Sequence, residues 1–249
     1  MKSFDPTIFT APTARPMPVV LVLDISGSMS GAKIRNLNDA VKNMLDTFRD
    51  NENGETEIHV AIITFGAEVR LHQPLASASQ IAWHDLSASG STPLGTACRM
   101  AKAMIEDRDV LPSRAYRPTV VLVSDGQPTD DWKQPLESFI TEGRSSKCFR
   151  MAMAIGADAD EKVLGKFTEG MSYPLFYAEN AGQLHEFFKL VTMTVTVRSV
   201  SQDKNAIPEF STIDAHPATI EERSAKHGGS GKSEKEAADH DEDTEEGYW

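Results

Sequence analysis

Five polar side chains with the chemistry of metal ligands lie in three separate segments of the sequence. Asp24, Ser26 and Ser28 occupy alternate positions directly after an apolar run, Thr92 lies in a Gly-Ser-Thr-Pro segment, and Asp125 lies in a Ser-Asp-Gly segment. Carboxylate and hydroxyl oxygens are the ligands that a hard cation such as Mg²⁺ prefers, with Mn²⁺ as the alternative ion. The sequence therefore predicts one divalent-cation site built from three loops.

Each of these residues also has an ordinary structural explanation. Ser28 could cap the helix expected after Gly31, Thr92 before Pro93 fits a helix N-cap, and Asp125 before a glycine fits a turn. A helix N-terminus repels a cation, so the two carboxylates would be needed to hold it. Because the ligands arrive from three loops at equivalent places, a shared metal site explains them together.

The segments that must position these loops alternate between strands and helices. Apolar, β-branched runs predict strands at 18–24, 57–65, 119–124, 149–155 and 175–177, and 3,4-spaced apolar residues predict helices at 34–48, 94–107, 132–145, 160–168 and 183–197. We expect an α/β fold with a doubly wound, mostly parallel sheet and helices on both faces. A hairpin of 57–65 with 68–71 is expected to add one antiparallel edge strand. The ligand loops would then meet at the carboxyl ends of the strands.

Three regions follow from composition along the chain. Residues 1–15, which contain prolines and no helical period, are expected to form an extended N-terminal arm, and residues 16–198 are expected to form the α/β domain. Residues 199–249 are expected to be an acidic, disordered tail, because the stretch 234–246 alone holds eight acidic residues and no aromatic one.

Charge and cysteine content exclude several classes of function. The net charge is −12 and the chain has no run of Lys or Arg, so a nucleic-acid partner is not expected. Cys98 and Cys148 match no metal-binding spacing and are expected to be buried, reduced thiols. The first apolar run is too short for a membrane span or a signal peptide, so we expect a cytoplasmic protein with no membrane partner.

The segments at 24–29, 89–95 and 124–132 resemble the metal-ion-dependent adhesion site (MIDAS) of von Willebrand factor A (VWA) domains. The resemblance extends over about 18–197 and is greatest to the bacterial TerY-like proteins of tellurium-resistance and stress clusters. It implies the Rossmann-like von Willebrand factor A fold. It also implies that Ser26, Ser28 and Thr92 contact Mg²⁺ directly or through water, that Asp24 and Asp125 bind it directly or support its ligands, and that a partner's Glu or Asp completes the octahedron.

The resemblance further implies a biological setting. It suggests a non-catalytic, Mg²⁺-dependent protein–protein interaction module in a bacterial cytoplasmic stress-response, tellurium-resistance-type or signalling complex. The partners would be a kinase, a phosphatase or another tellurium-resistance protein. Some relatives carry a cysteine-rich zinc module at the C-terminus, which a chain with two cysteines cannot build.

A metal-dependent hydrolase or phosphoryl-transfer enzyme is the alternative function. Such an enzyme needs a base, a nucleophile or a phosphate clamp beside the metal. The sequence has no G-x-x-x-x-G-K-[ST], no G-x-S-x-G and no histidine near the ligand loops. We therefore expect that the protein is not an enzyme.

Two acidic features have alternative interpretations. Asp130 and Asp131 could cap the helix expected at 132–145 or form an acidic rim that selects the partner, and Asp158 and Asp160 raise the same question. The tail could solvate the protein or recruit a partner, or its carboxylates could occupy the open metal position and block partner binding.

Overall fold

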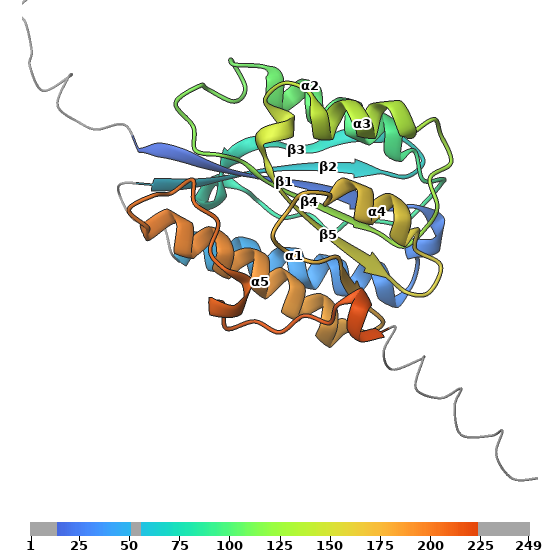
Figure 1. Cartoon of the computed structure of the whole chain (residues 1–249). Helices are drawn as coiled ribbons and strands as arrows, with labels where there is room; N and C mark the ends of the chain where they lie inside the picture. Colours follow the sequence, from blue (N-terminus) through green and yellow to red (C-terminus); the bar gives the residue numbers. More distant parts are fainter. Residues whose placement is uncertain (1–13, 51–55, 224–249) are drawn as a thin grey trace, which may run out of the picture.

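Six strands of the described chain form one sheet in the order β3-β2-β1-β4-β5-β6 (Figure 1). The computed structural model describes residues 14–50 and 56–223, so predictions for the arm at 1–13 and the tail from 224 onward lie outside the described residues. The strands are β1 Arg15–Asp24, β2 Thr56–Phe65, β3 Val69–Ser77, β4 Thr119–Ser124, β5 Phe149–Ile155 and β6 Phe176–Ala178. Every neighbouring pair is parallel except β2 with β3. The predicted mostly parallel sheet with one antiparallel edge strand is confirmed.

Helices cover both faces of this sheet. They are α1 Ala32–Asp50, α2 Leu94–Glu106, α3 Lys133–Thr141, α4 Glu161–Phe167 and α5 Ala181–Val200. α1 and α5 pack on one face, and α2, α3 and α4 pack on the other (Figure 1). The helices expected from apolar spacing are present, which confirms the doubly wound arrangement.

β1 shows why an uninterrupted apolar run suits the centre of the sheet. Val19, Leu21 and Leu23 pack in the core beneath α1 and α5, whereas Val20 and Val22 pack in the core beneath α2, α3 and α4. Fully burying each such side chain contributes about 1.5–3 kcal/mol, so both faces of the strand are apolar. The strand begins earlier than expected, because its first residues pair with the start of β2.

The strand order reverses between β1 and β4. The chain proceeds outward from β1 to β2 and β3, then crosses over to β4 and continues to β5 and β6. In a doubly wound sheet, ligands bind outside the carboxyl ends of the strands at this switch point. Asp24 ends β1 and Asp125 directly follows β4, so the two predicted carboxylates flank the switch point.

β3 is longer than the predicted partner strand at 68–71. It continues to Ser77, and its register with β2 shifts between the pairs of Ile62 with Gln73 and Val60 with Ala76. Pro74 lies within this irregularity, where a residue without an N–H group disturbs the pairing least. Proline in the sequence therefore marks a bulge in an edge strand and not its end.

Residues 201–223 differ from the expected disordered tail, because they pack against the domain. Phe210 contacts the rings of Tyr173 and Phe176 at centroid distances of 5.5 and 5.6 Å. The Tyr177 N–H donates to Ala218 O at 2.8 Å, so this segment pairs with β6. An edge strand needs such a cover to satisfy its outer backbone groups, and the expected boundary at 198/199 lies inside α5.

Two further observations concern thiols and membranes. Cys98 and Cys148 are free and buried, as expected, and burial raises the pKa of each thiol to about 12. Thiols in this state are unreactive at neutral pH.

Among the helices of residues 14–50 and 56–223, none has the length and apolar content that a bilayer crossing requires.

Candidate metal centre

Asp24 is the buried anchor of the site. It is fully buried at the carboxyl end of β1, where Oδ1 accepts the Ser26 N–H at 2.8 Å and Oδ2 accepts the Ser124 hydroxyl at 2.6 Å. Burial raises the pKa of Asp24, and the hydrogen bonds from Ser124 and Ser26 oppose this rise. Burial removes the water that would otherwise stabilise an ionised carboxylate at this position. A bound cation would supply that stabilisation instead.

A chain of hydroxyl groups links the first and third ligand loops. Ser28 lies in a short 3₁₀ helix, Gly27–Met29, and its hydroxyl donates to Asp125 Oδ1 at 2.6 Å. Ser26 Oγ lies 3.0 Å from Ser28 Oγ. Ser26, Ser28 and Asp125 therefore present their oxygens side by side, although Asp125 lies 97 positions after Ser28 in the sequence.

Thr92 joins this group from the second loop. A Cβ atom added to Gly126 would lie 3.5 Å from Thr92 Oγ1 and 3.7 Å from Ser28 Oγ, so both hydroxyls border the backbone directly after Asp125. The Thr92 backbone is fixed by the third loop, since its N–H donates to Thr129 Oγ1 at 3.0 Å and its carbonyl accepts the Thr129 N–H at 2.9 Å. The three predicted loops thus converge.

Close backbone contacts hold the first and second loops together. The Gly27 N–H donates to Gly90 O at 2.9 Å, and the Ser89 N–H donates to Ile25 O at 2.7 Å. Gly90 has a φ of +78°, and a Cβ there would lie 2.3 Å from the Ala67 backbone. Only glycine combines this left-handed conformation with such a close approach.

Two residues of the centre were not assigned a role from the sequence. Ser124 holds Asp24, and the Lys33 ammonium forms an ion pair with Asp125 Oδ2. Lys33 is in the first turn of α1, where a positive charge is unfavourable because of the helix dipole. A lysine in the first turn of a helix is therefore the sequence signal that could have identified Lys33 as the partner of a carboxylate elsewhere in the chain.

The two rim candidates lie in different environments. Asp130 accepts the N–H groups of Gly95 and Thr96, both at 2.8 Å, and the Thr96 hydroxyl at 2.9 Å. It therefore caps α2 across space, and not the helix that follows it in sequence. Asp131 is exposed. Asp160 caps its own helix, α4, by accepting the N–H groups of Lys162 and Val163.

The donor set fits a hard divalent cation. It offers the oxygens of Asp24, Ser26, Ser28, Thr92 and Asp125, and the carboxylate oxygens that already accept one hydrogen bond keep a further lone pair. Within the part of the chain that the structure describes, no group of three or more His, Cys, Asp or Glu residues could hold a metal ion. Any metal held here would depend on hydroxyl ligands, and the Lys33 charge would compete with it for Asp125.

Comparison with known proteins gives a consistent picture. Residues 19–190 match the family model of the von Willebrand factor type A domain. Human inter-alpha-trypsin inhibitor heavy chain H2 is 25% identical over 203 residues, which cover 74% of this chain and 20% of the human protein. The chain therefore spans about a fifth of the length of that curated relative.

Two solved structures share the fold. The von Willebrand factor type A structure from Catenulispora acidiphila is 21% identical, with a TM-score of 0.57 and coverage of 73% of this chain and 43% of that one. Proximal thread matrix protein 1 from the mussel byssus, with a zinc-occupied MIDAS motif, is 14% identical, with a TM-score of 0.52 and coverage of 72% and 48%. At these identities the likeness shows the fold alone.

Proposed function

This chain belongs to the von Willebrand factor type A domain family, and on that premise we propose that it is a non-catalytic, Mg²⁺-dependent protein–protein interaction module. Domains of this family commonly act as metal-dependent interaction or adhesion modules. The observation that carries the proposal is the convergence of Ser28, Thr92 and Asp125 around the Gly126 backbone, beside the buried Asp24.

Each residue has a defined role in this proposal. Ser26, Ser28 and Thr92 hold Mg²⁺, directly or through water, with Mn²⁺ as the alternative ion. Asp24 and Asp125 supply the negative charge and orient the hydroxyl groups. The bound metal supplies an electrophilic position that accepts a carboxylate oxygen from a partner's Glu or Asp.

The biological setting is a further part of the proposal. Resemblance of the three ligand loops to TerY-like proteins supports a MIDAS and a role in a bacterial cytoplasmic stress-response, tellurium-resistance-type or signalling complex. A kinase, a phosphatase or another tellurium-resistance protein is the proposed partner. Asp131, which is exposed near the site, is the better of the two candidates for a partner-selecting rim because Asp130 is engaged by α2.

The enzymatic alternative gains no support from the site. The Ser26 and Ser28 hydroxyls bond to each other, and Ser28 also bonds to Asp125. Within the described residues, neither hydroxyl is hydrogen-bonded to a histidine that could act as a general base.

Affinity purification from the native host tests the proposal. The full chain and its Asp24→Asn variant are each used as bait in Mg²⁺ and in EDTA, and the captured proteins are quantified by mass spectrometry. We expect a partner that is retained by the unmodified chain in Mg²⁺ and lost both in EDTA and with Asp24→Asn. Equal recovery of the same partners in all four samples would contradict a metal-dependent interaction.

A further inference from the structure

A second concave site lies at the opposite edge of the sheet from the metal centre. A cavity of about 640 Å³ opens beside the amino ends of β4 and β5, within the usual size range of small-molecule pockets. Its lining residues are Ile105, Leu111, Ser113, Ala115, Tyr116, Arg117, Pro118, Arg144, Lys147 and Asn205. Three of these are cationic and none is a carboxylate, although the chain as a whole carries a net charge of −12.

The two guanidinium groups of the pocket are held in place by backbone carbonyls. Arg144 Nη1 donates to Ile105 O at 2.7 Å, and Arg117 Nε donates to Lys147 O at 2.6 Å. Each group keeps further N–H donors that are not used in these bonds. Among the described residues, neither arginine nor Lys147 forms an ion pair with a carboxylate.

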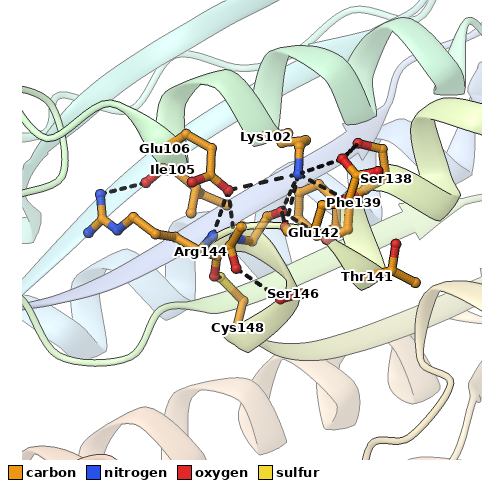
Figure 2. Close-up of polar contacts among 12 residues, drawn as sticks. Lys102, Ile105, Glu106, Ser138, Phe139, Thr141, Glu142, Arg144, Ser146 and Cys148 are labelled. Carbon is orange, nitrogen blue, oxygen red and sulfur yellow. Dashed lines mark hydrogen bonds and ion pairs between the residues drawn. The ribbon is translucent and has the colours of Figure 1, made fainter.

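The carboxylate of Glu106 is adjacent to this pocket but is engaged elsewhere. Its Oε1 accepts the backbone N–H groups of Arg144 at 2.7 Å and Ser145 at 3.0 Å, and it lies 3.8 Å from Lys102 Nζ. Figure 2 shows the Arg144 guanidinium extending away from this carboxylate toward the Ile105 carbonyl. Glu106 therefore fixes the Arg144 backbone without forming an ion pair with the guanidinium, although the two charges still attract each other at longer range and this attraction helps to lower the pKa of Glu106.

The pocket region has an excess of positive charge. Burial, followed by the positive charge of Arg117, lowers the pKa of the neighbouring Arg198 to about 10. Burial also lowers the pKa of Arg150, and Arg117 contributes to that effect as well. An anion bound at Arg117 would relieve this mutual repulsion.

The floor of the pocket is apolar. Ile105 and Leu111 are buried, and Pro118 and Ala115 add further carbon surface to the lining. A ligand with only a charged group would leave this surface in contact with water, whereas a ring or short chain would cover it.

We propose that this pocket binds a small organic oxyanion, whose phosphate or carboxylate group is held by Arg117 and Arg144 and whose apolar body lies over Leu111. Planar guanidinium groups match such oxyanions because they donate two parallel hydrogen bonds. Lys147, an exposed residue of the pocket lining, attracts the ligand without fixing its orientation. This binding is independent of the metal centre.

Calorimetric titration of the full chain with phenyl phosphate tests the proposal. EDTA is present throughout so that a metal ion cannot capture the phosphate, and inorganic phosphate and benzoate are titrated in parallel. We expect phenyl phosphate and benzoate to bind at one site per chain, and inorganic phosphate to bind more weakly than phenyl phosphate. Absence of binding by both organic anions, or equal affinity of the two phosphates, would overturn the proposal.

Substitutions locate the site. We expect Arg117→Gln and Arg144→Gln each to weaken phenyl phosphate binding roughly tenfold, as loss of a charge-assisted hydrogen bond predicts. Lys147→Gln removes charge without removing a side-chain contact that supports the fold, and should weaken binding about threefold through lost attraction. Arg99→Gln, on the exposed surface of α2, is the matched control and should leave the affinity unchanged. If Arg117→Gln and Arg144→Gln both kept the affinity of the unmodified chain, the anion would bind elsewhere.

Discussion

The Lys33 ammonium forms an ion pair with the fully buried carboxylate of Asp125. This contact places a positive side chain beside a proposed metal ligand. With Asp24 and Asp125 ionised, Lys33 cancels one of the two negative charges, so a bound divalent cation leaves the centre positive. A centre with this charge favours a negatively charged partner group, which is consistent with a carboxylate as the last ligand.

Replacing Lys33 should therefore strengthen metal binding. We expect Lys33→Met to raise the affinity for Mn²⁺ about tenfold, since removing a partly exposed cation in contact with a metal ligand changes the free energy of metal binding by on the order of 1 kcal/mol. Lys42→Met, on an exposed position of the same helix, serves as the control and should have no effect. Calorimetric titration with Mn²⁺ measures both, and an unchanged or lower affinity for Lys33→Met would mean that Lys33 does not compete with the metal.

Asp130 and Asp131 should differ in what they contribute. Asp130→Ala removes three hydrogen bonds at the start of α2, and we expect it to lower the free energy of unfolding by about 1–2 kcal/mol. Asp131→Ala should change it by less than about 0.5 kcal/mol because the side chain is exposed. Urea denaturation of the two variants compares them directly, and equal stabilities would argue against the cap.

Gly90 should tolerate no side chain. Gly90→Ala combines a left-handed backbone with a Cβ at 2.3 Å from the Ala67 backbone, so we expect a loss of more than about 2 kcal/mol of stability. Gly170→Ala is a useful comparison, because its φ is also positive but no atom lies within 4 Å of the added Cβ. Thermal unfolding should show a clearly larger decrease for Gly90→Ala. A similar decrease in both variants would assign the effect to backbone conformation alone.

Glu106 should make stability depend on pH. Burial would raise the pKa of Glu106, but hydrogen bonds from the Arg144 and Ser145 backbones and the charge of Lys102 outweigh it, and the pKa is lowered. The folded state thus binds this proton less tightly than the unfolded state, whose glutamate titrates near pH ~4.3. The stabilisation is present above that pH and is lost as the pH falls through the lower, folded pKa.

Substitution by glutamine isolates this contribution. We expect Glu106→Gln to lower the free energy of unfolding by about 1 kcal/mol at pH 7, a modest value because the group is partly exposed and screened. The difference from the unmodified chain should close as the pH falls from about 5 to about 3. Denaturation curves across this range measure it, and a constant difference at all pH values would assign the effect to packing.

The sequence predicted the sheet because its strands are unusually regular. The run at 19–23 has no polar residue, which is the composition of a strand buried on both faces. Such a strand belongs at the centre of a parallel sheet covered by helices. The same regularity placed Asp24 and Asp125 at neighbouring strand ends. In contrast, the cover formed by residues 201–223 depends on Phe210 and Ile213, two apolar residues within a polar stretch that has no periodicity.

The contacts that the sequence did not predict join residues far apart in the chain. Lys33, Ser124 and Asp130 each contact a residue that is far away in sequence, from 35 positions for Asp130 and Gly95 to 100 for Ser124 and Asp24. Local patterns define which helix or strand a residue belongs to, but not which loop its side chain will reach. Of the two alternatives for Asp130, a cap or a partner-selecting rim, the capping one named the following helix, whereas the residue caps α2.

Calorimetric titration of the full chain with Mn²⁺, compared with its Asp24→Asn variant, tests the central claim most directly. Asparagine keeps the shape of the side chain, and burial already disfavours the charge of Asp24, so the variant should be at least as stable as the unmodified chain in EDTA. Asp131→Asn is the matched control. The account predicts one ion per chain and at least about a 100-fold loss of affinity in Asp24→Asn alone. No binding by the unmodified chain, or equal affinity in Asp24→Asn, would contradict it.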